Sequence, residues 1–100
     1  MVFSKPCSFE SPTECVTIFG AENCSEGNFI LNYTPTCAGN CYQYSSFDSI
    51  TVQGNTIDST NCYVYSDINC KDLILETGDH QDTTCFNTPG AQSMICYFDC

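Results

Sequence analysis

Ten cysteines restrict how this chain of 100 residues can fold more than any other feature of its sequence. A domain of this length buries too little surface for an apolar core alone to hold it firmly. No CxxC pair occurs, and the shortest intervals are Cys37 to Cys41 and Cys96 to Cys100, which disfavours zinc-ribbon and thioredoxin-like sites. An even number of cysteines at wide, irregular spacing instead predicts five disulfides and a secreted, extracellular protein.

The predicted disulfide cysteines are Cys7, Cys15, Cys24, Cys37, Cys41, Cys62, Cys70, Cys85, Cys96 and Cys100. Ten cysteines allow about 900 pairings, so their number leaves the connectivity open. The first ten residues lack the apolar stretch of a signal peptide, and we therefore expect that a secretion signal has been removed.

The charge balance excludes several classes of partner. Only 2 basic residues stand against 12 acidic ones, for a net charge of -10. Such a chain cannot bind a phosphate backbone by counterion release, nor be captured electrostatically by anionic lipid. It also contains no apolar run long enough to span a membrane. The acidic residues predict a well-solvated surface. The alternative is that they bind a basic partner or a cation.

Two stretches of the chain repeat each other: CVTIFGAENC at 15–24 and CYVYSDINC at 62–70. Each joins a cysteine, a β-branched and aromatic run, a polar turn and a second cysteine. Apolar triplets, Thr-Cys pairs and Ser-Ile or Ser-Met-Ile steps follow in both. The sequence therefore predicts an irregular lead-in over 1–14, then one β domain over 15–100 made of two repeats. The repeats span 15–53 and 62–100.

Alternating apolar and polar residues predict an all-β domain of about eight short strands. The clearest strands are expected at 15–19, 28–33, 42–44, 47–52, 63–65, 72–76 and 93–98, with turns at 20–27, 66–69 and 86–90. Stacking two such units hides the apolar face of each. The predicted core is Val16, Ile18, Ile30, Ile50, Val52, Val64, Ile74 and Ile95.

The repeat resembles the βγ-crystallin superfamily over residues 15 to 96. The matching features are an aromatic residue (Phe19, Tyr65), a cysteine five positions later (Cys24, Cys70) and a serine step on the last strand (Ser49-Ile50; Ser93 with Ile95). This resemblance implies two similar Greek-key-like units forming a small disulfide-rich β-sandwich. The cysteines resemble an elaboration seen in small secreted fungal proteins that look like crystallins, among them killer toxins and plant-pathogen effectors.

Equivalent cysteines in two copies are expected to bond equivalently, which predicts the disulfides Cys24–Cys37 and Cys70–Cys85. The resemblance also suggests a calcium motif ending at Ser49 or Ser93. The positions of its Asn/Asp pair are occupied by Tyr44-Ser45 and by Thr88-Pro89, so neither copy keeps the motif. We predict no metal and no cofactor.

The sequence contains only weak signals of a catalytic site. His80 is the only histidine and lies in a polar loop, without a nucleophile placed by a recognisable motif. Asp79 with Asp82, or Glu22 with Glu26, could resemble a glycosidase pair, but a domain of this size has little room for a substrate cleft. We predict that the protein is not an enzyme.

Aromatic residues exceed what a small core absorbs, and tyrosine is favoured at interfaces. Either these rings stack on the cystines and close the sandwich, or some form a recognition surface. Our candidate for such a surface is Tyr42, Tyr44 and Phe47, beside the 37–41 loop.

These features together predict a monomeric, effector-like or toxin-like protein that binds an extracellular protein or glycan of a host or competitor. One alternative is an inhibitor of a secreted protease or glycosidase, presenting 35–40 or 78–84 as a rigid loop. Another is a structural surface protein. Asn23 and Asn32 begin possible N-glycosylation triplets.

Overall fold

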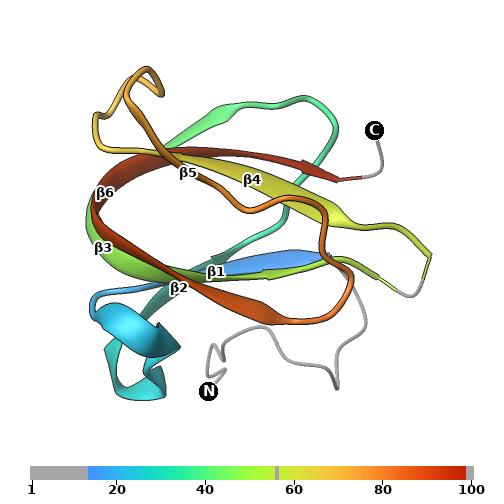
Figure 1. Cartoon of the computed structure of the whole chain (residues 1–100), viewed down its shortest axis with the longest axis horizontal. Coiled ribbons are helices and arrows are strands. Elements are labelled where there is room, and N and C mark those ends of the chain that lie inside the picture. The colour runs from blue at the N-terminus through green and yellow to red at the C-terminus, as the bar shows by residue number, and fades with distance from the viewer. Residues whose placement is uncertain (1–13, 56, 99–100) are drawn as a thin grey trace, which may run out of the picture.

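The computed structural model describes residues 14–55 and 57–98, which form an all-β domain with one six-stranded antiparallel sheet (Figure 1). The strands are β1 (Cys15–Phe19), β2 (Phe29–Tyr33), β3 (Cys41–Gln53), β4 (Thr60–Tyr65), β5 (Leu73–Glu76) and β6 (Thr84–Phe98). Two short 3-10 segments, η1 (Glu22–Cys24) and η2 (Glu26–Asn28), are the helical elements in the described part of the chain. The predicted fold class is therefore confirmed at the level of an all-β, disulfide-rich domain.

The expectation of about eight strands was too high, because one pair of predicted strands forms a single long, bent strand and a predicted turn lies inside another. Strand β3 runs through both 42–44 and 47–52, and β6 runs through the predicted turn at 86–90. Both strands change register where they pair around Phe47. In β6 the bend coincides with Pro89, which has no N–H to donate, and with Gly90 at φ 80°.

These two bent strands divide the sheet into two layers, as Figure 1 shows. The first layer contains β2, β1, the second half of β3 and the first half of β6. The second layer contains β5, β4, the second half of β6 and the first half of β3. Each layer thus takes strand segments from both halves of the chain.

The strand register relates the two layers by an approximate twofold rotation. Matching β1, β2 and β3 with β4, β5 and β6 turns the order β2-β1-β3-β6-β4-β5 into its own reverse. Residues 44 positions apart correspond along β3 and β6, because Cys41 pairs with Ile95 while Cys85 pairs with Thr51. Phe47 pairs with Ala91, so the axis passes between these two residues. Both hairpins also carry a register shift at the same place, next to Ile18 and next to Val64.

The core lies between the layers and receives side chains from both. Its buried apolar residues are Val16, Ile18, Phe47, Ile50, Val52, Cys62, Val64, Ala91, Met94 and Cys96. Five of the eight predicted core residues are among them. Ile30 is only half-buried, Ile74 is 44% exposed and Ile95 is half-buried. These three predictions were therefore wrong. For Ile95 the reason is the strand register: the residue equivalent to Ile50 is Met94, and Ile95 faces outward.

Two of the disulfides among the described residues join the two halves of the chain, and a third, Cys62–Cys96, lies within the second half. The bridges are Cys24–Cys85, Cys41–Cys70 and Cys62–Cys96, and Cys15 and Cys37 are also disulfide-bonded. The predicted pairs Cys24–Cys37 and Cys70–Cys85 are therefore wrong. The error came from matching Cys85 with Cys37, whereas the register matches Cys85 with Cys41. Each hairpin turn consequently bonds to the first half of the other copy's long strand. Cys7 and Cys100 lie outside the described residues.

Candidate functional site

The turn between β4 and β5 is organised by one carboxylate. Asp67 accepts hydrogen bonds from the backbone N–H groups of Asn69 (3.0 Å), Lys71 (2.9 Å) and Asp72 (2.9 Å). These bonds, led by those from Asp72 and Lys71, stabilise the charged carboxylate and hold the pKa of Asp67 below its ordinary value. The turn therefore has a defined shape although most of its residues are exposed.

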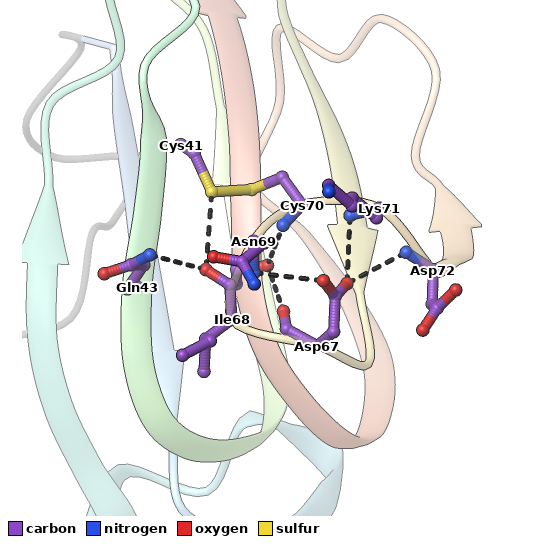
Figure 2. Close-up of a disulfide and its surroundings, with 9 residues drawn as sticks. Cys41, Gln43, Asp67, Ile68, Asn69, Cys70, Lys71 and Asp72 are labelled. Carbon is purple, nitrogen blue, oxygen red and sulfur yellow. Dashed lines mark hydrogen bonds between the residues drawn. A yellow bond between two sulfur atoms is a disulfide. The ribbon is translucent and has the colours of Figure 1, made fainter.

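Two strands of the second layer then fix this turn in place (Figure 2). The Ser93 hydroxyl donates to the carbonyl oxygen of Asp67 and accepts the N–H of Cys70 at 3.2 Å. The Gln43 amide donates to the carbonyl oxygen of Ile68 at 2.6 Å, and Cys41 bonds covalently to Cys70. The turn is thus tied to β6 and to the start of β3.

The turn between β1 and β2 is tied down by the equivalent groups. The Ser49 hydroxyl donates to the carbonyl oxygen of Ala21 at 2.6 Å and accepts the N–H of Cys24 at 2.9 Å. The Asn87 side chain, which corresponds to Gln43, accepts the N–H of Asn23 at 2.7 Å. The serine, amide and cystine contacts are thus common to both turns, whereas the Asp67 carboxylate belongs to the second alone.

Three tyrosines project from the outer surface of the second layer. Tyr63 and Tyr65 alternate along β4 with the buried Cys62 and Val64, so they point away from the core. Cross-strand partners share a face, which adds Ile95 opposite Tyr63 and brings in Tyr97 two residues beyond it. We call Tyr63, Tyr65, Ile95 and Tyr97 the outer tyrosine face. All four residues are half-buried.

The rings of this face contact one another. Tyr63 and Tyr97 meet edge to face, with ring centroids 6.0 Å apart. Burial, followed by the neighbouring Tyr97 and Tyr63 and by Asp67, raises the pKa of Tyr65, so its hydroxyl stays protonated at neutral pH. The face therefore presents amphipathic rings next to a carboxylate.

The first layer carries different residues at the corresponding positions. Thr17, Thr51 and Gln53 replace Tyr63, Ile95 and Tyr97, and their exposed fractions are 0%, 7% and 3%. Phe19, which corresponds to Tyr65, is 1% exposed. The outer tyrosine face is consequently a property of one layer and not of the shared architecture.

The candidate recognition residues predicted from sequence lie elsewhere. Phe47 is fully buried on the twofold axis, so its side chain is not available to a partner. Tyr42 pairs with the buried Met94 and faces the core, and its ring contacts that of Tyr33 in a tilted arrangement with the ring centroids 4.9 Å apart. Tyr44 likewise packs against the core cluster. Burial, then Tyr44 and Tyr33, raises the pKa of Tyr42.

The loop before β3 contacts the outer tyrosine face instead. Gly39 has φ +67°, and a Cβ there would lie 2.4 Å from Cε1 of Tyr97. Only glycine lets the loop approach the ring this closely. The alternation of Tyr63 and Tyr65 with Cys62 and Val64 was the signal in the sequence that could have placed these two rings outward.

His80 makes contacts that hold its own loop together. Its Nε2 lies 2.7 Å from the carbonyl oxygen of Thr77 and its Nδ1 lies 3.4 Å from the Thr84 hydroxyl. Its backbone exchanges two 3.0 Å hydrogen bonds with Thr60, and its ring meets Phe86 edge-on. Both ring nitrogens thus face neighbouring groups of the 77–84 segment.

The carboxylates and amides considered as sites are dispersed. Asp79, Asp82, Glu22 and Glu26 are exposed. The Asn32 amide oxygen accepts a 2.7 Å hydrogen bond from Thr17, within the first layer. Within residues 14–55 and 57–98, no three His, Cys, Asp or Glu side chains gather as a metal-ligand set. The described residues also contain no helix with the length and apolarity needed to cross a membrane.

Comparisons with protein-family models, with curated protein sequences and with solved structures gave no match to this chain.

Proposed function

We propose that this chain is a secreted, non-enzymatic binding protein of the effector or toxin-like type, and that it engages a host or competitor molecule through the outer tyrosine face. The observation that carries the proposal is the difference between the layers. Tyr63, Ile95 and Tyr97 are half-buried, with part of each side chain exposed, where the first layer has the buried Thr17, Thr51 and Gln53. Tyrosine and apolar residues grouped on a rigid sheet are the usual composition of an interface centre.

Rigidity supports a binding role. The outer tyrosine face lies on strands crosslinked by Cys62–Cys96, and its adjacent turn is bonded to β3 by Cys41–Cys70. A surface already held in shape loses little conformational entropy when a partner binds. The disulfides are also typical of small extracellular domains, which favours secretion.

The duplicated architecture supports the finer description of the fold, two Greek-key-like units of the βγ-crystallin kind. Each unit supplies a folded hairpin whose turn is held by a serine on the long strand, Ser49 or Ser93. The function proposed for the tyrosines does not depend on this kinship.

A face-exchange variant tests the proposal. Tyr63→Thr, Ile95→Thr and Tyr97→Gln together give the second layer the residues that the first layer already carries, so the sheet should still form. Immobilised wild-type protein should retain a component of host or competitor extracellular fluid, and the face-exchange variant should lose it. Ile57→Ser, at an 80% exposed loop position, is the matched control and should retain it. Equal retention by the wild type and the face-exchange variant would refute the proposal.

Inhibition of a secreted hydrolase is a second candidate, favoured by the tethering of the 78–84 loop. The carbonyl oxygen of Gln81 accepts the N–H of Gly54 at 3.1 Å, and the two bonds of His80 to Thr60 lie beside it. Asp79, Gln81 and Asp82 remain exposed on this held backbone. Inhibition of secreted proteases or glycosidases at micromolar concentration, lost on exchanging 79–82, is the expected result. An unaffected enzyme panel would eliminate this candidate.

A further inference from the structure

Strand β5 lies at the edge of the sheet beside the outer tyrosine face. It pairs with β4 on one side, and no other described strand pairs with its outer side. Two large apolar side chains of β5 are exposed, Leu73 at 53% and Ile74 at 44%. An exposed edge strand can accept another extended chain by main-chain hydrogen bonding.

The opposite edge of the sheet is better covered. The corresponding strand β2 has Phe29 and Ile30 where β5 has Leu73 and Ile74. Phe29 and Ile30 are both half-buried, and Ile30 packs against the core cluster. The exposure of β5 is thus specific to the second layer, as the outer tyrosine face is.

The register places two different kinds of contact along this edge. Leu73 pairs with Tyr65, and Glu76 pairs with Tyr63. The first pair forms an apolar position, whereas the second joins a carboxylate to an aromatic ring, a combination that suits a Lys or Arg side chain. Tyr63 and Tyr65 are two residues apart on β4, which is also the spacing of same-side residues in any extended peptide.

Charge around the edge favours a cationic partner. From Asp67 to Asp82 the chain carries five carboxylates (Asp67, Asp72, Glu76, Asp79 and Asp82) against one cation, Lys71. A second copy of this chain would bring another net charge of -10 to the same edge, which disfavours self-association.

We propose that the β5 edge and the outer tyrosine face together bind an extended protein segment that carries an apolar residue and a Lys or Arg two positions apart. The segment adds to β5, its apolar side chain contacts Leu73 and Tyr65, and its cation lies between Glu76 and Tyr63. This assignment depends on the proposed binding function and names the chemical class of the partner.

Peptides of matched composition test the spacing. The probe is an eight-residue peptide of the repeat Val-Thr-Arg-Thr, and its isomer repeats Val-Arg-Thr-Thr with the same charge. The probe should bind at least fivefold more tightly than the isomer, and the equivalent Glu-containing peptide should bind more weakly still. On binding, hydrogen exchange should slow at the backbone amides of 73–76. Equal affinity of the two isomers, or protection confined to other strands, would overturn the proposal.

Paired substitutions separate local recognition from overall charge. Glu76→Gln and Glu22→Gln change the net charge equally, but only Glu76 lies beside Tyr63. Affinity for the probe should fall about fivefold to twentyfold with Glu76→Gln and less than twofold with Glu22→Gln. Equal losses would reduce the interaction to unspecific charge attraction and overturn the site, as would a dimer that forms through β5 and blocks the probe.

The two proposals can fail separately. If the face-exchange variant loses its extracellular partner while the wild type ignores the probe, the binding function stands and the cationic segment is wrong. If the probe behaves as expected but the face-exchange variant keeps the natural partner, the peptide site stands and the proposed functional role of the tyrosines is wrong.

Discussion

The two layers of this protein share nearly the same strand arrangement and equivalent serine hydrogen bonds and disulfides at their turns, but their outward-facing residues differ. Ser49 and Ser93 make equivalent hydrogen bonds to the two hairpin turns, and Cys85 and Cys41 bond to equivalent turn cysteines. On the outer side, the first layer has buried polar residues, and the second has half-buried tyrosines beside an edge strand whose Leu73 and Ile74 are exposed. The shared arrangement determines where the strands lie, and the outward positions are free to differ.

This difference locates the site better than any single residue does. A serine hydroxyl that satisfies two backbone groups of a turn is needed in both layers, so its presence says nothing of function. A tyrosine at a position where the other layer has threonine has no such structural requirement. We therefore expect a binding role where residues at twofold-equivalent positions differ between the layers. These differences lie on β4, β5 and the end of β6.

A substitution on the twofold axis should have the largest effect on stability. Phe47→Ala should lower the free energy of unfolding by about 3–5 kcal/mol, because it opens a cavity at a fully buried position. The exchange variant Phe47→Ala with Ala91→Phe should recover part of this loss, since the two residues face each other across the axis. Urea denaturation measures both. An exchange variant no more stable than Phe47→Ala would argue against equivalent surroundings.

The buried cystine can be compared directly with an uncrosslinked counterpart. Cys62 and Cys96 pair across β4 and β6 where the first layer pairs Val16 with Val52. The double variant Cys62→Val with Cys96→Val should keep the fold and lose roughly 3 kcal/mol, mainly through the freer unfolded chain. Circular dichroism and urea denaturation are the measurements. Loss of the folded state would show that the second layer, unlike the first, requires the crosslink.

The two turn serines should prove equal. Ser49→Ala and Ser93→Ala each leave a turn N–H and a turn carbonyl without their partner, which should cost about 1–3 kcal/mol in either layer. A difference between the two variants larger than about 1 kcal/mol would show that the carboxylate of the second turn compensates for its serine.

The smallest effect concerns Asp67, whose position in the first turn is occupied by Ala21. The folded pKa of Asp67 lies below its ordinary value of 3.8, so on acidification the unfolded chain takes up the proton first. Its stabilising contribution is therefore complete above pH 3.8 and is lost as the pH falls through the lowered folded pKa. Urea midpoints for wild type and Asp67→Asn should differ at pH 7 and converge in strong acid. A gap that stays constant down to pH 2 would contradict this assignment.

Local pattern was enough to predict much of the fold. Alternation at 15–19 and 63–65 predicted β1 and β4, and the repeated cysteine, aromatic and serine positions predicted two similar units. Prediction from local pattern failed where the answer depends on the register between strands that are distant in sequence. Matching Thr36-Cys37 with Thr84-Cys85 was reasonable from neighbouring residues, yet the register matches Cys85 with Cys41.

The amino-acid sequence alone determined the all-β class, the dependence on cystines and the acidic surface, because these follow from composition and from a period of two along each strand. Tertiary structure decided which half of the chain each turn is bonded to, and which aromatic side chains face outward. Local alternation could place Tyr63 and Tyr65 outward, but it did not place Tyr42 or Tyr97. Tyr42 lies opposite the buried Met94, whereas Tyr97 lies two residues beyond the outward-facing Ile95. Only the pairing of strands distant in sequence assigns one ring to the core and the other to the surface.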